Sequence, residues 1–145
     1  HAFVTDAIAK SFSYLCEKFL AGPLKTKKAA HLTHLHRTFS GELKRGACDE
    51  DILQKLHPTP AVGGVPPQQA LKKIREIEAF DRGWYAGPIG MVSKEKSQFA
   101  VALRSGLIEG DTLTLYGGCG IVAASVAEKE YEETYQKIQT LLGSL

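Results

Sequence analysis

The segment GLIEGDTLTLY, residues 106–116, has the pattern of a β-hairpin. Its centre, Glu109-Gly110-Asp111, separates two apolar runs and carries the residue types that tight turns favour. The strands that this turn joins are predicted over residues 98–108 and 112–116, and a third strand is predicted over residues 84–92. We therefore expect antiparallel β-structure in this half of the chain.

Four helices are predicted around these strands. Apolar residues at helical spacing predict a first helix over residues 1–20, which Gly22-Pro23 ends and which begins without a capping residue, as a chain cut inside or just before a helix would. Further helices are predicted over residues 49–56, 68–80 and 127–142. Residues 29–43 alternate as a strand does, and residues 58–67 form a Pro- and Gly-rich loop. This order predicts an α+β fold with an antiparallel sheet and flanking helices.

Composition limits the class of protein. With 145 residues, of which 43% are hydrophobic, the chain is expected to form one domain over residues 1–145. The net charge of +2 favours neither a nucleic-acid nor a membrane partner. The three cysteines are far apart and form no CxxC pair, which argues against a zinc site or a disulfide framework. Without a predicted membrane span or signal peptide, a cytoplasmic location is expected.

Glycines and glutamates adjoin near the end of the chain. Gly117, Gly118 and Gly120 leave backbone amides accessible, which suits an anion, yet four glutamates follow within residues 128–133. Glu130, Glu133 and Lys137 share one face of the predicted helix. A solvated acidic face with a Glu133–Lys137 pair is the common case. The alternative is a Mg²⁺ site that bridges two glutamates to a carboxylate substrate held by the glycine loop.

A separate stripe of apolar residues on the same helix is expected to pack inward: Tyr131, Tyr135, Ile138 and Leu142.

Three further side chains have two interpretations each. Arg104, predicted within a half-buried strand, needs a carboxylate partner, which is either a ligand or a protein acid. Tyr85 is either a core aromatic residue or a hydroxyl with space beside it. His34 is either a structural or a site histidine, and His31, His34 and His36 lack the spacing of a transition-metal site.

Four ordered blocks together resemble the isochorismate synthases of the chorismate-utilising enzymes: LHPTPAVGGVP, FDRGWYAGPIG, FAVALRSGLIEG and LYGGCGIVAASVAEKEYEETYQK. The resemblance covers nearly the whole chain and is weaker before residue 32. It implies the C-terminal part of a chorismate-binding domain, with the second half of an anthranilate synthase component I-like fold. The HPTPAVGG block favours isochorismate synthase over salicylate- or anthranilate-forming relatives.

The resemblance also assigns roles residue by residue. Glu133 is implied as a Mg²⁺ ligand with Glu130 beside it, so Mg²⁺ is the expected cofactor. The implied substrate-binding residues, for chorismate or isochorismate, are His34 over the ring, Tyr85 with Arg104 on one carboxylate, the amides of Gly118, Cys119 and Gly120 on another, and Lys137 as a neutralising charge. Cys119 stands where the family usually has alanine.

The family's general-base lysine, general-acid glutamate and a further metal-binding glutamate all precede this region. The resemblance therefore implies no catalytic residue in this chain and makes the N-terminal half of the same enzyme its expected partner. Two hypotheses remain open. The chain is either part of an isochorismate synthase, whose product enters menaquinone, siderophore or salicylate synthesis, or a non-catalytic, partner-binding module of a split enzyme.

Overall fold

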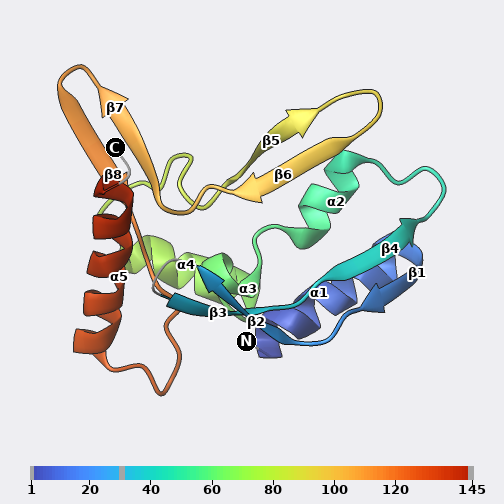
Figure 1. Cartoon of the computed structure of the whole chain (residues 1–145), viewed down its shortest axis with the longest axis horizontal. Helices are drawn as coiled ribbons and strands as arrows, with labels where there is room; N and C mark the ends of the chain where they lie inside the picture. Colours follow the sequence, from blue (N-terminus) through green and yellow to red (C-terminus); the bar gives the residue numbers. More distant parts are fainter. Residues whose placement is uncertain (1, 30–31, 144–145) are drawn as a thin grey trace. The chain divides into compact units, whose positions relative to one another are not determined.

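The computed structural model describes residues 2–29 and 32–143, with the side chains of residues 28–34 outside the description. The chain divides into two compact units, His1–Glu76 and Ile77–Leu145. Helices and short antiparallel strands make up both units, so the α+β prediction is confirmed (Figure 1).

The first unit contains two antiparallel strand pairs and four helices. Its elements are α1 (Ala2–Leu15), β1 (Cys16–Ala21), β2 (Lys25–Ala29), β3 (Leu32–His36), β4 (Phe39–Leu43), α2 (Asp49–Leu56), α3 (Pro60–Gly63) and α4 (Pro67–Ile77). Strand β1 pairs with β4, and β2 pairs with β3. The helix predicted over residues 49–56 is confirmed. Its first turn is closed by the Asp51 carboxylate, which accepts the backbone N–H of Cys48 at 3.0 Å.

The prediction of one helix over residues 1–20 is wrong after Leu15. Residues 16–21 form β1 instead, where Phe19 lies opposite Gly41 of β4. The Phe12 ring packs against Phe19 and Phe39, with ring centroids 5.9 and 5.5 Å apart. The apolar spacing fits a helix or a strand, and pairing with a distant strand selects the second.

Three other predictions for this unit need correction. The single strand over residues 29–43 is two strands, β3 and β4, separated by Arg37 and Thr38. The loop over residues 58–67 contains the short helix α3. The helix predicted over residues 68–80 is α4, which begins one residue earlier and ends at Ile77. It can begin at Pro67 because a proline is accommodated at a helix start.

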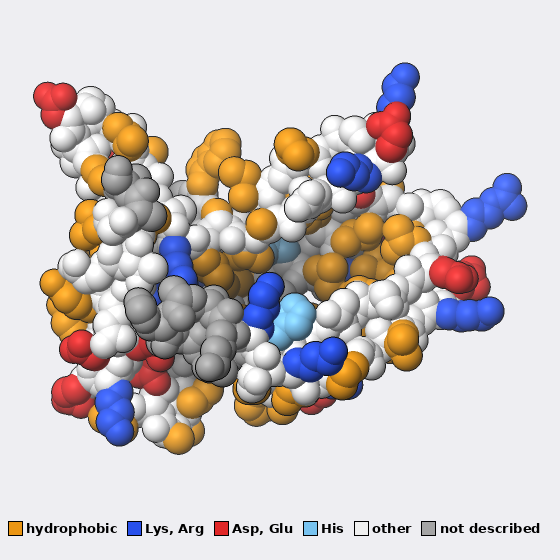
Figure 2. Space-filling model, in the orientation of Figure 1, with side chains coloured by type: hydrophobic (Ala, Val, Ile, Leu, Met, Phe, Trp, Pro, Cys, Tyr) orange, Lys and Arg blue, Asp and Glu red, His pale blue; other side chains and the backbone are white. Residues whose placement is uncertain are grey.

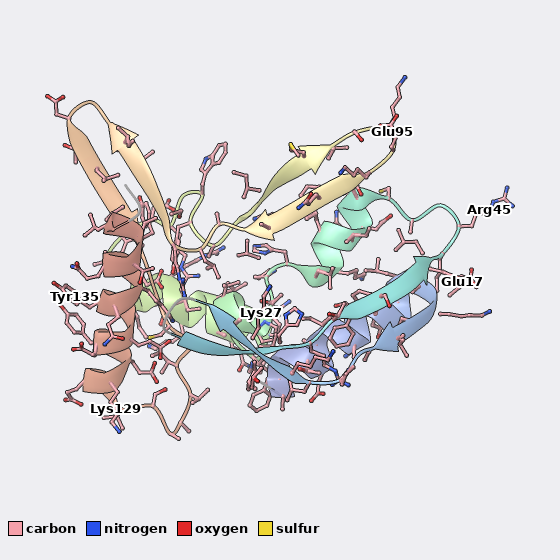
Figure 3. All side chains as sticks on the ribbon, in the orientation of Figure 1. Glu17, Lys27, Arg45, Glu95, Lys129 and Tyr135 are labelled. Atoms are coloured by element: carbon pink, nitrogen blue, oxygen red, sulfur yellow. The ribbon has the colours of Figure 1, made fainter. Side chains whose placement is uncertain are left out.

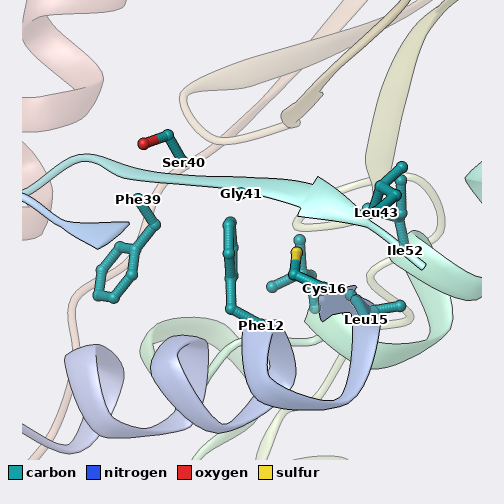
Figure 4. Close-up of a pocket in the computed structure, with 9 residues that line it drawn as sticks. Phe12, Leu15, Cys16, Phe39, Ser40, Gly41, Leu43 and Ile52 are labelled. Carbon is teal, nitrogen blue, oxygen red and sulfur yellow. The ribbon is translucent and has the colours of Figure 1, made fainter. Parts of the chain in front are cut away.

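An apolar pocket of about 280 Å³ lies in the first unit between α1, β4 and α2 (Figure 4). Its lining residues are Phe12, Leu15, Cys16, Phe39, Ser40, Gly41, Leu43, Ile52 and Leu56. No charged side chain is in this lining, so the pocket resembles an incompletely filled core and not a chemical site.

The second unit consists of two β-hairpins and the last helix. Its elements are β5 (Pro88–Val92), β6 (Ser97–Val101), β7 (Ser105–Glu109), β8 (Thr112–Tyr116) and α5 (Ala127–Leu142). Strand β5 pairs with β6 and β7 with β8. The predicted hairpin turn is confirmed, since Glu109 pairs with Thr112 across Gly110 and Asp111. The helix predicted over residues 127–142 is confirmed.

Two strand predictions in this unit are too long. The strand predicted over residues 84–92 begins at Pro88, because Trp84, Tyr85 and Ala86 form a turn. The strand predicted over residues 98–108 is interrupted, and Arg104 lies exposed between β6 and β7. Ala86 and Arg104 have φ angles of 63° and 50°, in the left-handed region that a strand does not contain.

Few of the described side chains are buried. Among the described hydrophobic residues, only Leu15, Cys16 and Ala86 are buried, whereas Trp84 is 86% exposed. Hydrophobic side chains appear at many places on the face that Figure 2 shows.

The apolar stripe predicted on α5 does not pack inward along its length. Tyr131 is 77% exposed, and Tyr135 is 52% exposed and projects away from the helix (Figure 3). Two hairpins cannot cover every face of a 16-residue helix. No helix among the described residues is long and apolar enough to cross a membrane.

Candidate functional site

The glycine loop, residues 117–120, follows β8 directly and packs on α5. A Cβ atom at Gly117 would lie 2.8 Å from Cγ1 of Ile138, so glycine permits α5 to approach the loop backbone. Lys137 of the same helix donates a hydrogen bond from Nζ to the carbonyl oxygen of Gly118 at 3.1 Å. The loop and the acidic helix are therefore joined.

Tyr85 meets the same loop from a different segment. A Cβ atom at Gly118 would lie 2.7 Å from the Tyr85 hydroxyl oxygen, and the Tyr85 ring stacks on Tyr116 at 5.4 Å and 16°. The Tyr85 hydroxyl therefore lies beside the Gly118 backbone, where the absence of a side chain on glycine leaves space for it. Burial raises the pKa of Tyr85, so the hydroxyl keeps its proton at neutral pH and remains a hydrogen-bond donor.

An ion pair between Arg82 and Glu78, which the sequence analysis did not predict, lies beside the Tyr85 ring. Arg82 forms two hydrogen bonds with Glu78, 2.7 Å from Nε to Oε2 and 2.5 Å from Nη2 to Oε1. The hydrogen-bonded Glu78 carboxylate raises the pKa of Arg82, and the guanidinium carbon lies 5.8 Å from the centre of the Tyr85 ring. The signal was the four-residue spacing of Glu78 and Arg82, which suits such a pair.

Arg104 follows a backbone segment that is hydrogen-bonded to the Tyr85 turn. Ala86 N–H donates to the Ala102 carbonyl at 2.9 Å, and Ala102 N–H donates to the Gly87 carbonyl at 2.8 Å. These bonds hold the segment before Arg104 beside Tyr85. Within residues 2–29 and 32–143, Arg104 has no ion pair, so the described residues do not supply the protein acid that was one of its two predicted partners.

On α5, Glu133 and Lys137 form an ion pair of 2.6 Å between Oε1 and Nζ. The predicted pair is confirmed. The two side chains differ in exposure: Glu133 is 52% exposed and Lys137 only 17%. Lys137 is directed toward the loop, while half of the Glu133 side chain remains accessible.

Glu130 has polar neighbours on the segment that precedes α5. Hydrogen bonding with the Ser125 side chain, and then with the Cys119 thiol, lowers the pKa of the Glu130 carboxyl. The Cys119 thiol also donates to the Glu130 carbonyl at 3.5 Å. Burial raises the pKa of Cys119, so the thiol is neutral at pH 7. Sequence reasoning overlooked Ser125.

The donor set fits Mg²⁺ better than a transition metal. The described part of the chain contains no group of three or more His, Cys, Asp or Glu residues that a metal would join. Two carboxylates three residues apart on one helix, Glu130 and Glu133, are of the type that suits a hard cation, which takes its remaining oxygens from water and substrate. The roles of these glutamates stay predictions.

The predicted histidine cannot be assigned a place in this site. His34 is in β3 of the first unit, and its side chain lies outside the described part of the structure. His31 also lies outside the described residues. The structure therefore groups Tyr85, the glycine loop, Glu130, Glu133 and Lys137, and the role of His34 stays a prediction.

Comparison with known proteins identifies relatives of this chain. The family model described as chorismate binding enzyme matches residues 1–145. The chain is 44% identical to isochorismate synthase MenF of Bacillus subtilis over 148 residues, which is 100% of this chain and 31% of that protein. It therefore spans about a third of this relative's length.

Solved structures show the same fold. The menaquinone-specific isochorismate synthase MenF of Escherichia coli superimposes with a TM-score of 0.87 at 34% identity, covering 97% of this chain and 32% of that one. Anthranilate synthase component I of Streptococcus pneumoniae superimposes with a TM-score of 0.89 at 27% identity, covering 97% and 33%. The family match over the whole chain and these shared folds mean that this chain belongs to the chorismate binding enzymes.

Proposed function

We propose that this chain supplies the substrate-carboxylate and metal side of a Mg²⁺-dependent isochorismate synthase, which converts chorismate to isochorismate. The observation that supports the proposal is the hydrogen bond of Lys137 to the Gly118 carbonyl, which joins the glycine loop to the acidic face of α5. The 44% identity to an isochorismate synthase supports the choice of reaction.

The loop amides would bind one carboxylate of chorismate. The described residues offer no backbone acceptor to the N–H groups of Cys119 and Gly120, and a Cβ atom at Gly120 would meet nothing within 4 Å. Unpaired amides beside open space are donors that suit an anion. Tyr85 and Arg104 would bind the second carboxylate, the first as a neutral donor and the second as a bidentate fork.

Glu133, with Glu130 beside it, would hold Mg²⁺. The ion would neutralise the substrate carboxylate and fix its position. Lys137 offsets part of the negative charge that two glutamates and a carboxylate bring together, because its ammonium lies 2.6 Å from Glu133.

The conversion itself exchanges one hydroxyl for another. A water attacks C2 of chorismate as a base takes its proton, and the C4 hydroxyl leaves with a proton from an acid. We assign the lysine base and the glutamic acid to the part of the enzyme that this chain, at 31% of a relative's length, does not span. The residues of this chain bind and orient the substrate.

Product analysis of the complete enzyme tests this function. Purified enzyme that contains this segment is incubated with chorismate and Mg²⁺, with and without ammonium, and the products are separated by chromatography. Isochorismate as the main product supports the proposal. Anthranilate would assign the chain to the ammonia-using relatives, and salicylate to the salicylate synthases. Bound chorismate without turnover would support the non-catalytic module.

The relatives include a menaquinone-specific, a 2,3-dihydroxybenzoate-specific and a salicylate-biosynthesis isochorismate synthase, so the pathway that uses the product is a separate part of the proposal. Deletion of the gene in its host, with quinone and siderophore levels as readouts, tests that part of the proposal.

A further inference from the structure

Tyr85 lies in a backbone turn that begins at Arg82. The Tyr85 N–H donates to the Arg82 carbonyl at 2.8 Å, and the N–H of the next residue, Ala86, donates to the Ala102 carbonyl at 2.9 Å. These bonds fix the backbone at Tyr85 but not the direction of its side chain, which still rotates about two bonds. The hydroxyl that lies beside the Gly118 backbone is at the far end of that side chain.

Two neighbours restrain the Tyr85 ring. Tyr116 stacks on it, with ring centroids 5.4 Å apart and planes 16° apart. Offset stacks form over a range of centroid separations, so this contact fixes the tilt of the ring more closely than its position. The guanidinium carbon of Arg82 lies over the ring, 5.8 Å from its centre, and adds the attraction between a cation and a π system. The position of the hydroxyl therefore depends on both neighbours.

Glu78 determines where the Arg82 guanidinium lies. Arg82 donates from Nε to Oε2 of Glu78 at 2.7 Å and from Nη2 to Oε1 at 2.5 Å, and such a bidentate contact sets the plane of the guanidinium as well as its position. Each side chain of the pair is 26% exposed, so water screens the pair less than it screens a surface ion pair. The Nε–Nη2 edge of Arg82 is occupied by Glu78 and is therefore not offered to a substrate carboxylate.

We propose that Arg82 is a positioning residue for Tyr85: its guanidinium, held by Glu78, keeps the Tyr85 ring where the hydroxyl reaches the substrate carboxylate. This inference rests on the proposed function, because it concerns the carboxylate contact assigned there to Tyr85. An ion pair that only stabilises the fold would not alter substrate binding. A positioning contact changes the KM for chorismate and leaves Mg²⁺ affinity unchanged, because Tyr85 is assigned to the substrate and not to the metal.

The chain contains a matched control for this contact. Arg37, in the first unit, lies over the Phe39 ring at 5.6 Å, and its Nε donates to the Gly22 carbonyl at 2.7 Å. Arg37 and Arg82 thus both combine a cation over an aromatic ring with an Nε–H that is bound to an oxygen. Neither Arg37 nor Phe39 is among the predicted site residues. A change that follows from the loss of any arginine–ring contact would appear at both positions.

The test compares steady-state kinetics, Mg²⁺ affinity by calorimetry and melting temperature in the complete enzyme. Arg82→Met keeps an apolar chain but removes the cation, so we expect the KM for chorismate to rise about 3- to 30-fold, the range of a cation–ring contact, with the Mg²⁺ Kd unchanged. Arg82→Lys keeps the charge without the planar fork and should recover part of the loss. Arg37→Met should leave the KM unchanged.

A double-mutant cycle tests whether Arg82 acts through Tyr85. In a Tyr85→Phe background, Arg82→Met should add little to the KM, because the hydroxyl that Arg82 positions is absent. A rise as large as that in the wild-type background would show that Arg82 acts by another route.

Removal of Arg82 leaves the Glu78 carboxylate without this partner, which can lower stability by itself. If Arg82→Met does not fold, the combination of Glu78→Gln with Arg82→Met replaces it, since the charge of Glu78 is then removed as well. We expect this double variant to fold and to keep the KM raised about 3- to 30-fold. A wild-type KM in the double variant would assign the pair to stability alone and overturn the inference.

The outcomes separate this inference from the proposed function. A wild-type KM in folded Arg82→Met, an equal rise in Arg37→Met, or an undiminished rise in the Tyr85→Phe background would overturn the inference and leave the proposed function intact. A wild-type KM in Tyr85→Phe itself would refute the carboxylate role of Tyr85, and wild-type enzyme that does not convert chorismate would refute the proposed reaction. Either of these two results would overturn the inference as well.

Discussion

The ammonium of Lys137 lies 3.1 Å from the carbonyl oxygen of Gly118, although the two residues are separated by 19 positions in the chain. A trans peptide unit directs its C=O and N–H to opposite sides. With the Gly118 carbonyl turned toward Lys137, the N–H of Cys119 in the same peptide unit is turned away from it. Lys137 thus fixes the direction of an amide that we assign to the substrate.

Replacing Lys137 by methionine should weaken chorismate binding in the complete enzyme. A hydrogen bond to a charged group contributes about 1.5–3 kcal/mol, so we expect the apparent KM to rise about 10- to 100-fold. Lys129→Met removes the same charge from the exposed side of α5 and is the control. A KM equal to that of the wild type in Lys137→Met would contradict the role of this lysine, as measured by steady-state kinetics.

Neighbouring glutamates on α5 should respond differently to substitution. Glu133→Gln keeps the side-chain shape but removes the charge that a hard cation prefers, so Mg²⁺ affinity and turnover should fall strongly. Glu132 lies about 100° around the helix from Glu133. It accepts a hydrogen bond from Gln136 at 3.1 Å, so Glu132→Gln should change little. Calorimetric Mg²⁺ titration compares the two, and equal losses would mean that the assigned helix face is wrong.

Arg104 should show opposite effects on stability and binding. A non-glycine residue in the left-handed region is strained by about 1–2 kcal/mol, and Arg104 has φ 50°. We expect Arg104→Gly to keep or raise the melting temperature while chorismate binding is lost. Arg104→Lys should raise the KM without changing Mg²⁺ affinity, because lysine lacks the bidentate fork. A fall in melting temperature with unchanged KM in Arg104→Gly would assign the residue a structural role instead.

Gly118 and Tyr85 should be coupled energetically. A methyl group at Gly118 would lie 2.7 Å from the Tyr85 hydroxyl oxygen, an overlap expected to destabilise the enzyme by about 1–3 kcal/mol in Gly118→Ala. In a Tyr85→Phe background the hydroxyl is absent, so the same change should be less damaging. Denaturant unfolding of the four proteins in this double-mutant cycle measures the coupling, and strict additivity would show that the two groups do not meet.

The 145-residue chain by itself should neither convert chorismate nor remain monomeric. The general base and general acid that we assign elsewhere each contribute about 100- to 10,000-fold in rate. Exposed apolar residues such as Trp84 and Tyr131 leave faces uncovered, which favours self-association. Light scattering and a chorismate assay on the isolated chain test both points. A monomer with a cooperative melt, or Mg²⁺-dependent turnover, would show instead that this chain is an autonomous unit.

Local sequence patterns were sufficient to predict the features that depend on residues close together in the chain. The turn at Gly110-Asp111, helix α5 and the Glu133–Lys137 pair were all predictable, because a turn, a helix period and a four-residue spacing are set within a few residues. The ordered sequence blocks also identified the family correctly. These blocks can be recognised without knowing where each strand begins.

Contacts between distant segments were decided only by the tertiary structure. Residues 16–21 leave the predicted helix because β4 offers them a partner, and Arg104 leaves its predicted strand because the Ala86–Ala102 hydrogen bond redirects the chain. Lys137 reaches the Gly118 carbonyl only once α5 packs on the loop. Hydrogen bonds and close packing between distant segments depend on which surfaces meet in the folded chain. The spacing of residues along the sequence does not specify those contacts.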